Sequence, residues 1–424
     1  MRLCLIASRP TDSVTYGILP AAARLGLDVV LLTDQPSPHE QARARARLMP
    51  RPGGLARATD PGRDDGSVQL VPCDVWDARA LIRAIEGLAA PDAIFSNSDH
   101  LQVQTALAAA YFGLPGKDWR SALRARDKSL MRRRLADTGV EQVATAEIHS
   151  GTTHPVTDLA YPVVLKPSEG VASEDVVLVS DPGELEQRSA DILTRRPGQL
   201  LLAEEYLPGG LRTLETLGDG VTTWVLGGFR TTLSPPPYFI EERLTWDSAP
   251  PRAAGEHVMG ALAALGGGFG ACHTEYVVDP GRRTALIEVN DRLIGDHCDF
   301  FLSDLLGTDL FERVLRVYLG EPLPPGPPPA PPPDRAHAII DYVVADRPGL
   351  LATPPPAGPR PSSEPGVRLS WWPLRSGGEH VTVTGTNRDY LGVITAAGPD
   401  RGAVERSVAA LRAATSWEIT EPGR

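Results

Sequence analysis

The chain contains few of the residue types that mark several protein classes. Its four cysteines, Cys4, Cys73, Cys272 and Cys298, lie far apart and form no C-x-x-C pair. This pattern does not suit a disulfide framework or a structural zinc site, so we expect reduced thiols in a cytoplasmic protein. No apolar run approaches the ~20 residues of a membrane span. The apolar stretch Leu3–Ala7 is too short for a signal sequence, so we expect neither export nor a membrane partner.

Positive charge is also limited. The 424 residues include 42 lysines and arginines against 53 aspartates and glutamates, which gives a formal net charge of −11. Such a surface repels polyphosphate chains, and the short cluster Arg132–Arg134 is typical of a solvated helix face. We therefore expect no nucleic-acid partner. Hydrophobic residues make up 42% of the chain, as in ordinary globular proteins, and the length predicts about three domains.

Lysine is the scarcest of the charged residues, and Lys117, Lys128 and Lys166 are the only ones. In a chain that uses arginine so freely, a lysine indicates a place where a compact point charge is needed, such as against phosphate oxygens. Lys128 begins a helix predicted over 128–137, and Lys166 ends a strand predicted over 163–166. The loop after Lys166 consists of small residues around Gly170, so its backbone N–H groups can cover phosphates. The alternative is an ordinary hairpin turn beside an exposed lysine.

The first part of the chain alternates strands and helices. Strands are predicted at 2–7, 28–33 and 92–96, and helices at 18–25, 78–88 and 101–112. This order predicts a parallel α/β sheet with helices on both faces, over residues 1–116. Because ligands bind at the carboxyl ends of such strands, the loops Ser8–Ser13 and Asn97–Asp99 are candidate binding segments. No G-x-G-x-x-G follows the first strand, so a dinucleotide cofactor is not expected.

The predicted secondary structure changes after residue 116. Residues 117–320 contain mainly strand-like runs and predict an α+β domain. Residues 321–334 are rich in proline, which favours an extended linker, although a ligand for a proline-binding module has the same composition. Residues 335–424 predict a small α+β closing domain, with strands at 338–344, 380–385 and 391–397 and a helix at 401–415.

The most informative stretch predicts a hairpin of two strands, 274–278 and 285–289, joined by the turn Asp279–Arg283. Folding about this turn places Glu275 opposite residue 287 or 288. Glu288, Asn290 and Arg292 then share one face. Two carboxylates this close repel each other unless a cation lies between them, and hard oxygen ligands suit Mg²⁺.

Two alternatives remain for this hairpin. It could be a surface feature in which the two acids pair with the nearby arginines. It could also take part in a zinc site through His273, His297 and Cys298, although no recognised zinc spacing is present.

Taken together, these segments resemble the ATP-grasp superfamily over about residues 1–320, and within it the amino-acid and dipeptide ligases of biosynthetic pathways, including natural-product pathways. The matching order is a first lysine, a strand-ending lysine with a phosphate loop, a nucleotide hinge, and an acid pair with Asn and Arg. The residues that carry it are Arg126-Asp-Lys128, Tyr161-Pro-Val-Val-Leu-Lys166-Pro-Ser-Glu-Gly170, Leu201-Leu-Ala-Glu204-Glu205-Tyr-Leu207, His273-Thr-Glu275 and Ile287-Glu288-Val-Asn290-Asp-Arg292.

The resemblance implies an ATP-grasp fold with a Rossmann-like N-terminal domain, a mobile nucleotide-binding lobe over 161–210 and a closing domain. It implies a carboxylate–amine ligase that uses ATP and Mg²⁺, with Mn²⁺ as an alternative, and an acyl-phosphate intermediate. Its partners would be small molecules, namely a carboxylate such as an amino acid and an amine, and a homodimer is left open. Other activities on this fold are a carboxylase, a phosphotransferase or a non-catalytic ATP-binding module.

The resemblance also implies roles for single residues. ATP would be bound by Lys128, Lys166, Gly170, Ser173, Glu204, Glu205 and Leu207, and the metal by Glu275, Glu288 and Asn290. The catalytic residues would be Arg292 and Lys166. The candidate substrate contacts are Glu215, Arg230, His273 and Arg292, and the cationic Arg230 would suit a free α-carboxylate. For Glu215, Arg230 and His273 the alternative is a structural salt bridge or a residue on the strand surface. His273 or Glu241 could accept the amine proton, a choice that the sequence leaves open.

The sequence departs from the family pattern in two places. The phosphate loop has one clear glycine, Gly170, and carries Glu174 and Asp175 close to the expected phosphates. After the hinge, the segment Gly209–Arg212 lacks an acid for the ribose hydroxyls. The first departure puts the closure of the loop in question, and the second leaves ribose recognition unassigned.

Overall fold

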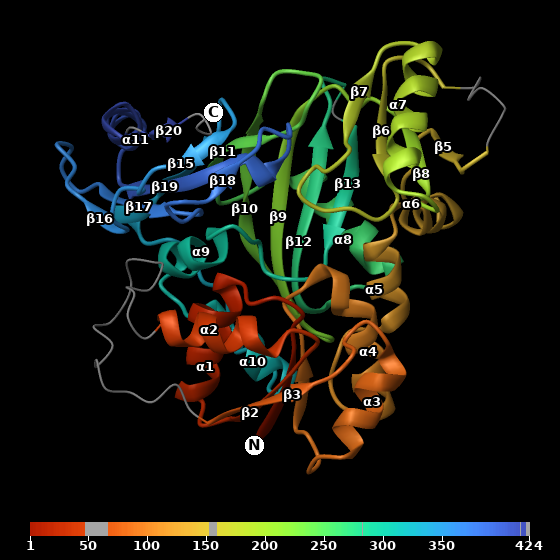
Figure 1. The fold of residues 1–424 in the computed structure, drawn as a ribbon, viewed down its shortest axis with the longest axis vertical. Coiled ribbons are helices and arrows are strands. Elements are labelled where there is room, and N and C mark those ends of the chain that lie inside the picture. The colour runs from red at the N-terminus through yellow and green to blue at the C-terminus, as the bar shows by residue number, and fades with distance from the viewer. Residues whose placement is uncertain (47–66, 152–158, 282, 416, 421–424) are drawn as a thin grey trace.

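The structure, a computed structural model, describes residues 1–46, 67–151, 159–281, 283–415 and 417–420. Figure 1 shows the N-terminal α/β part in red and orange at the bottom, the strands β5 to β8 at the upper right, and the C-terminal strands in blue at the upper left. A large green sheet lies between them. Within the described ranges, no helix is both long enough and apolar enough to cross a membrane.

The N-terminal sheet is parallel, as the alternating pattern predicted. Its strand order is β3-β2-β1-β4, and β3 was not among the predicted strands. Alternate residues of β1 pack on opposite faces: Leu3 and Leu5 contact the core that includes α1 and α10, whereas Cys4 and Ile6 pack with α3 and α4. The strands are β1 (Arg2–Ile6), β2 (Asp28–Thr33), β3 (Val68–Pro72) and β4 (Ala93–Phe95). The helices are η1 (Ser13–Ile18), α1 (Leu19–Arg24), α2 (Pro36–Ala46), α3 (Ala78–Glu86), η2 (Asp99–Leu101), α4 (Gln102–Tyr111), α5 (Trp119–Arg126) and α6 (Lys128–Asp137).

A second sheet is small and antiparallel, with order β5-β8-β6-β7 and the helix α7 against it. Its apolar core lies between the sheet and α7, where Val163, Leu165 and Ala203 face Leu185 and Ile192. The register places Lys166 beside Leu202, so the end of β6 lies next to the hinge strand β8. The elements are β5 (Thr145–Ile148), β6 (Val163–Pro167), β7 (Val177–Val179), α7 (Pro182–Arg195) and β8 (Leu201–Glu205).

The central sheet has nine strands, in the order β13-β12-β9-β10-β11-β14-β19-β17-β16. The strands are β9 (Gly210–Asp219), β10 (Thr223–Leu233), β11 (Glu241–Asp247), β12 (Phe269–Val278), β13 (Thr284–Asn290), β14 (His337–Val344), β16 (Gly358–Arg360), β17 (Arg368–Pro373) and β19 (Tyr390–Gly398). The helices are α8 (Arg252–Leu265), α9 (Cys298–Leu306), α10 (Leu310–Tyr318) and α11 (Arg401–Ala414), with short helices η3 (Pro333–Arg335) and η4 (Asn387–Asp389). A three-stranded sheet completes the chain, with β18 (His380–Val381), β15 (Gly349–Leu351) and β20 (Ile419–Thr420).

The C-terminal segment extends the central sheet. Strand β14 pairs antiparallel with β11, with Leu244 opposite Ile340, so the sheet is continuous across the proline-rich segment 321–334. The domain boundaries at residues 320 and 335 stay a prediction. In the structure, strands after residue 335 belong to the same sheet as the acid hairpin.

Candidate active site

The predicted hairpin is present, and it brings the two acids together. Strands β12 and β13 are antiparallel neighbours, and Glu275 is paired with Glu288 and His273 with Asn290. The register shifts directly after Glu275, where Tyr276 is paired with Leu286, so Ile287 is an extra residue on β13. Directly opposite residues in an antiparallel pair point to the same side of the sheet. The two carboxylates therefore share a face, as the sequence predicted.

Burial and mutual repulsion affect these two acids differently. Burial raises the pKa of Glu288, and the charge of Glu275 raises it further, while Lys128 opposes the shift from 2.9 Å away. Burial also disfavours the charge on Glu275, but a hydrogen bond from His273 and its positive charge lower the pKa of Glu275 overall. A site that holds two carboxylates this way is stabilised by a cation.

The donor set fits a hard divalent cation. Glu275, Glu288 and the side-chain oxygen of Asn290, which is buried beside them on β13, are the oxygen ligands that Mg²⁺ prefers. Among the described residues, no cluster of three or more His, Cys, Asp or Glu side chains is assembled as a metal site. A metal at this hairpin would therefore be held by two carboxylates and an amide, and would keep ligand positions open for phosphates.

The contacts of the described residues do not fit the two alternative interpretations of the hairpin. Arg283 pairs with Glu205 and Arg292 with Asp99, so the acid pair does not use these two arginines; Arg282, the third arginine of that alternative, lies outside the described residues. The residues of the zinc alternative have separate partners, since His297 contacts Asp12, Cys298 contacts Tyr342 and His273 contacts Glu215.

All three lysines are buried, with Lys117, Lys128 and Lys166 exposed by 8%, 5% and 4%. The Nζ atom of Lys128 donates to Glu288 at 2.9 Å and to the carbonyl of Gly170 at 3.3 Å. The Nζ atom of Lys166 lies 2.7 Å from Glu204. The Nζ atom of Lys117 instead donates to two backbone carbonyls of β12, those of Phe269 and Ala271. The alternative of an exposed lysine in a hairpin turn is therefore wrong for Lys166.

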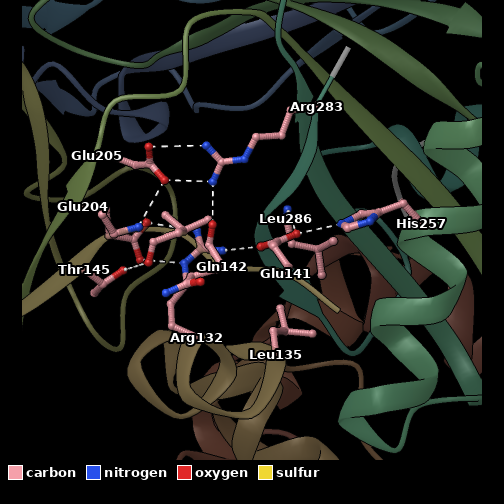
Figure 2. A network of polar contacts seen from close by, with 12 residues as sticks. Arg132, Leu135, Glu141, Gln142, Thr145, Glu204, Glu205, His257, Arg283 and Leu286 are labelled. Atoms are coloured by element: carbon pink, nitrogen blue, oxygen red, sulfur yellow. Dashed lines mark hydrogen bonds and ion pairs between the residues drawn. The ribbon is translucent and has the colours of Figure 1, made fainter. Parts of the chain in front are cut away.

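Figure 2 shows a buried ion network in which Arg132 of α6 lies between Glu204 of β8 and Glu141. The Nε and Nη2 atoms of Arg132 donate to the two carboxylate oxygens of Glu204, both at 2.9 Å. The interpretation of Arg132–Arg134 as a solvated helix face is wrong for Arg132, which is buried because α6 turns this position toward β8. Burial opposes the charge on Glu204, but Arg132 and Lys166 lower its pKa to about 2.

This network predicts a large stability difference between two adjacent residues. Glu204→Gln leaves the buried charge of Lys166 without its carboxylate and leaves Arg132 with Glu141 alone, so we expect a loss of about 3 kcal/mol of unfolding free energy at neutral pH. The neighbouring Glu205 is half-buried and pairs with the exposed Arg283, so Glu205→Gln is expected to cost less than about 1 kcal/mol. Urea denaturation of both variants measures the difference.

The pH dependence checks the same network. The pKa of Glu204 is depressed in the folded state, so its contribution is present above its ordinary pKa and is lost as the pH falls toward about 2. The stability curve of Glu204→Gln should therefore fall less steeply than that of the wild type over this acidic range. Equal curves for wild type and Glu204→Gln would contradict the assignment.

One cavity of about 850 Å³ gathers most of the predicted site residues. Its walls come from the N-terminal loops 8–13 and 97–99, the phosphate loop, the hinge, the acid hairpin and the C-terminal segment. The predicted residues that line it are Lys128, Lys166, Gly170, Ser173, Glu204, Glu205, Leu207, His273, Glu275, Glu288, Asn290 and Arg292. Its volume suits a nucleotide together with small substrates.

Two predicted substrate contacts, Glu215 and Arg230, are outside the residues that line this cavity. Glu215 is buried behind His273 and lies 2.8 Å from its Nδ1 atom. It positions the imidazole. Burial disfavours the charged imidazole, but Glu215 raises the pKa of His273 to about 10. Arg230 is paired with Arg212 across the sheet, on the face opposite to Glu275 and Val277, and its side chain is 46% exposed beside Asp247. The alternation of β10 thus turns Arg230 away from the cavity.

Arg292 has a partner that the sequence did not predict. Its Nε atom donates to Asp99 Oδ2 at 2.5 Å, and its Nη1 atom to the carbonyl of Leu293 at 2.8 Å. Burial opposes the charge, but Asp99 raises the pKa of Arg292 above its ordinary value. The sequence did give one sign that Asp99 belongs to the site: it lies in the loop after β4, which was predicted to approach a ligand. The pairing itself joins residues 193 positions apart.

The acids in the phosphate loop are compensated. Glu174 lies 2.9 Å from Arg196, and Asp175 lies 2.7 Å from both Arg195 and Arg196 at the end of α7. Glu174 also pairs with Arg388. The negative charges that were expected to oppose loop closure are therefore paired with arginines outside the loop.

The cavity is lined by the parallel α/β part and by two antiparallel sheets, and two buried lysines and the acid pair lie in its wall. The chain has the ATP-grasp fold. It is similar over 100% of its length to 99% of an L-amino acid ligase from Bacillus licheniformis, with a TM-score of 0.73 and 21% identity. A phosphoribosylglycinamide synthetase from Anaerococcus prevotii has a TM-score of 0.67 and 11% identity, with 99% of both chains covered.

A third structure is the biotin carboxylase domain of 2-oxoglutarate carboxylase from Hydrogenobacter thermophilus, in complex with MgADP. It has a TM-score of 0.66 and 17% identity, and the match covers 99% of this chain and 90% of that one. No protein-family model matches the sequence. An uncharacterized protein of Sinorhizobium fredii, y4rH, is 27% identical over 326 residues, and the match covers 73% of this chain and 64% of that protein. The matched region is thus less than two thirds of the length of that relative.

Proposed function

We propose that the chain is an ATP- and Mg²⁺-dependent carboxylate–amine ligase that forms an amide through an acyl phosphate and releases ADP and phosphate. One observation carries the proposal: Glu275 is paired with Glu288 in the same cavity as Lys128 and Lys166. Two carboxylates this close repel each other unless a cation binds between them, and the compact ammonium groups of lysine bind phosphate oxygens well. The ATP-grasp fold supports the same assignment.

The chemical need for ATP explains the remaining residues. A carboxylate is a poor acylating agent because its leaving group would be oxide, and transfer of the γ-phosphoryl group makes the leaving group phosphate. Lys128 and Lys166 would offset the charge of the moving phosphoryl group. Mg²⁺, when bound at Glu275, Glu288 and Asn290, would supply further charge compensation for phosphate oxygens.

Arg292 would then act on the second half of the reaction. Its guanidinium lines the cavity, and Asp99 fixes its orientation. The amine would attack the acyl carbon, the carbonyl oxygen would become an oxyanion to which Arg292 donates, and the tetrahedral intermediate would then expel phosphate. Closure of the phosphate loop near Gly170 and Ser173 would exclude water from the intermediate. The backbone near Glu205 and Leu207 would bind adenine.

We propose two amino acids, or an amino acid and a small amine, as substrates, in a biosynthetic pathway of natural-product type. The likeness to a solved L-amino acid ligase favours this choice over other carboxylates. His273 remains a candidate substrate contact, because it lines the cavity between Glu215 and Glu275. We place the reaction in the cytoplasm, where ATP is available. The four cysteines are free, as a reducing compartment would keep them.

The test is a screen for phosphate release with ATP, Mg²⁺ and every pair of the twenty amino acids, with mass spectrometry of each positive pair. We expect release that depends on two different amino acids and a product mass equal to their sum less one water. Release stimulated by bicarbonate in place of an amine would replace the proposal with a carboxylase. Nucleotide binding without any turnover would leave a non-catalytic ATP-binding module.

A further inference from the structure

The phosphate loop after β6 has a backbone that ordinary residues rarely adopt. Within Ser168–Val176, Ala172, Ser173 and Asp175 have positive φ values of 58°, 56° and 57°, while the glycine of the loop, Gly170, does not need one. Residues with a Cβ atom disfavour this left-handed region. A loop with three such residues keeps its shape only where contacts from outside hold it.

Contacts of this kind come from the C-terminal segment. The Nε atom of Arg388 donates to Glu174, which lies 214 positions earlier in the chain. The backbone N–H of Asn387 donates to the carbonyl of Ala172 at 3.1 Å. The side chain of Asn387 also exchanges two hydrogen bonds with Glu241, one to its carboxylate at 3.2 Å and one from its backbone N–H at 3.1 Å.

The turn that presents Asn387 and Arg388 is rigid. We call Thr384–Asp389 the latch turn. The carboxylate of Asp389 is buried and accepts the backbone N–H groups of Thr384 at 2.9 Å and Gly385 at 2.8 Å. Arg375 also donates to the carbonyl of Arg388. The tip of the turn therefore meets the phosphate loop in a fixed position.

The latch turn also lies at the cavity itself. Asn387 and Arg388 line the same cavity as Lys128 and Lys166, and Glu241, to which Asn387 is bonded, lines it as well. The turn is anchored to β11 through Glu241 and to the phosphate loop through Ala172 and Glu174. It thus joins the loop to the central sheet.

We propose that Asn387 and Arg388 are positioning residues of the phosphate loop, so that the C-terminal segment completes the site for the phosphates of a nucleoside triphosphate. The inference rests on the proposed function, because that function assigns the loop to ATP. In this role the latch turn acts through the loop. It holds Ala172 in the left-handed conformation in which the loop lines the cavity, and so reduces the ordering that nucleotide binding requires.

Arg388→Ala tests the proposal with two measurements. Hydrogen exchange of the amides of residues 171–176 is measured on nucleotide-free protein, and binding of a non-hydrolysable ATP analogue with Mg²⁺ is measured by calorimetry. We expect faster exchange and weaker binding, each by about fivefold, which is the scale that a partly exposed ion pair supports. With an identified substrate pair, the KM for ATP should rise while kcat changes less. Arg388→Lys should restore part of both effects.

The matched control is Arg347→Ala. Arg347 and Arg388 both lie in the C-terminal segment and have side chains 54% and 52% exposed, but Arg347 pairs with the adjacent Asp346. A double-mutant cycle with Glu174→Gln adds a second criterion: the effects of Glu174→Gln and Arg388→Ala should be less than additive, since both remove the same contact.

The outcomes separate this inference from the proposed function. Exchange in Arg388→Ala equal to that in Arg347→Ala, or fully additive effects with Glu174→Gln, would overturn the positioning role whatever the activity of the protein. A second outcome is that the wild type binds the analogue and Arg388→Ala shows the expected faster exchange, but the wild type forms no amide. This result would refute the ligase assignment and would still support the positioning role of the latch turn.

Discussion

Glu288→Gln should reduce ATP-dependent amide formation by about 1,000-fold while the protein stays folded. Glu288 is opposite Glu275 and accepts a hydrogen bond from Lys128 at 2.9 Å, so one carboxylate serves both the proposed cation and the first lysine. Charge compensation by a metal in phosphoryl transfer contributes several kcal/mol, and each ~1.4 kcal/mol is a factor of ten in rate. Glutamine keeps the size of the side chain and removes its charge. The rate with the amino-acid pair from the screen measures the effect.

Two further measurements make this prediction specific. Titration with Mg²⁺ should show that ADP binds the wild type more tightly as the metal concentration rises, and that Glu288→Gln largely loses this dependence. The control is Glu256→Gln, which removes an acid from α8 that is 63% exposed and paired with Arg252. Normal turnover in Glu288→Gln, or an unchanged response to Mg²⁺, would show that the acid pair is not the metal site.

The acid pair could be predicted because its geometry is local. The alternation of polar and apolar residues in 274–278 and 285–289 fixes the faces, and the turn between them limits the register to one or two choices. In the structure Glu275 is paired with Glu288, and a bulge lies at Ile287. The sequence could not decide between residues 287 and 288 as the partner of Glu275. The parallel sheet of the N-terminal part was predictable because strands and helices alternate there along the chain, but neither the order of its strands nor β3 was predicted.

Contacts between distant segments could not be predicted in this way. Arg292 and Asp99 lie 193 positions apart, and nothing in either local pattern selects the other as its partner. Arg132 looked like a surface residue because its neighbours are arginines, but the fold places it between two buried acids. Arg230 was expected near a substrate carboxylate, and its place on the other face of the sheet depends on pairings that the sequence alone does not fix.

The proline-rich segment 321–334 illustrates how an accurate local interpretation can leave the arrangement open. Its composition predicts a linker, and a linker suggests that the residues beyond it form a separate unit. The chain after it returns to the central sheet as β14, next to β11, and then places Tyr342, Arg375, Asn387 and Arg388 at the cavity. None of these four was predicted as a site residue, because no local sequence motif marks them. The pairing of β14 with β11 brings this part of the chain to the cavity.

The second large effect is expected from Arg292→Ala, which should lower kcat by about 100- to 1,000-fold with a small change in the KM for ATP, the range seen when one oxyanion donor is removed. Arg292 lies just after β13, beside the acid pair, and its Nε and Nη1 atoms are held by Asp99 and the carbonyl of Leu293. A guanidinium fixed this way is pre-organised for a charge that develops during the reaction. Steady-state kinetics with the identified substrate pair measure both constants.

Asp99→Asn separates orientation from charge. It keeps the guanidinium but weakens the contact that orients it, so kcat should fall by a smaller factor than in Arg292→Ala. If Asp99 acts only through Arg292, the double variant should be no slower than Arg292→Ala alone. Arg24→Ala, which removes an arginine paired with Asp309 on the N-terminal part, controls for the loss of an ion pair. A further loss in the double variant would mean that Asp99 contacts the substrate itself, and an Arg292→Ala enzyme of normal kcat would mean that another donor stabilises the oxyanion.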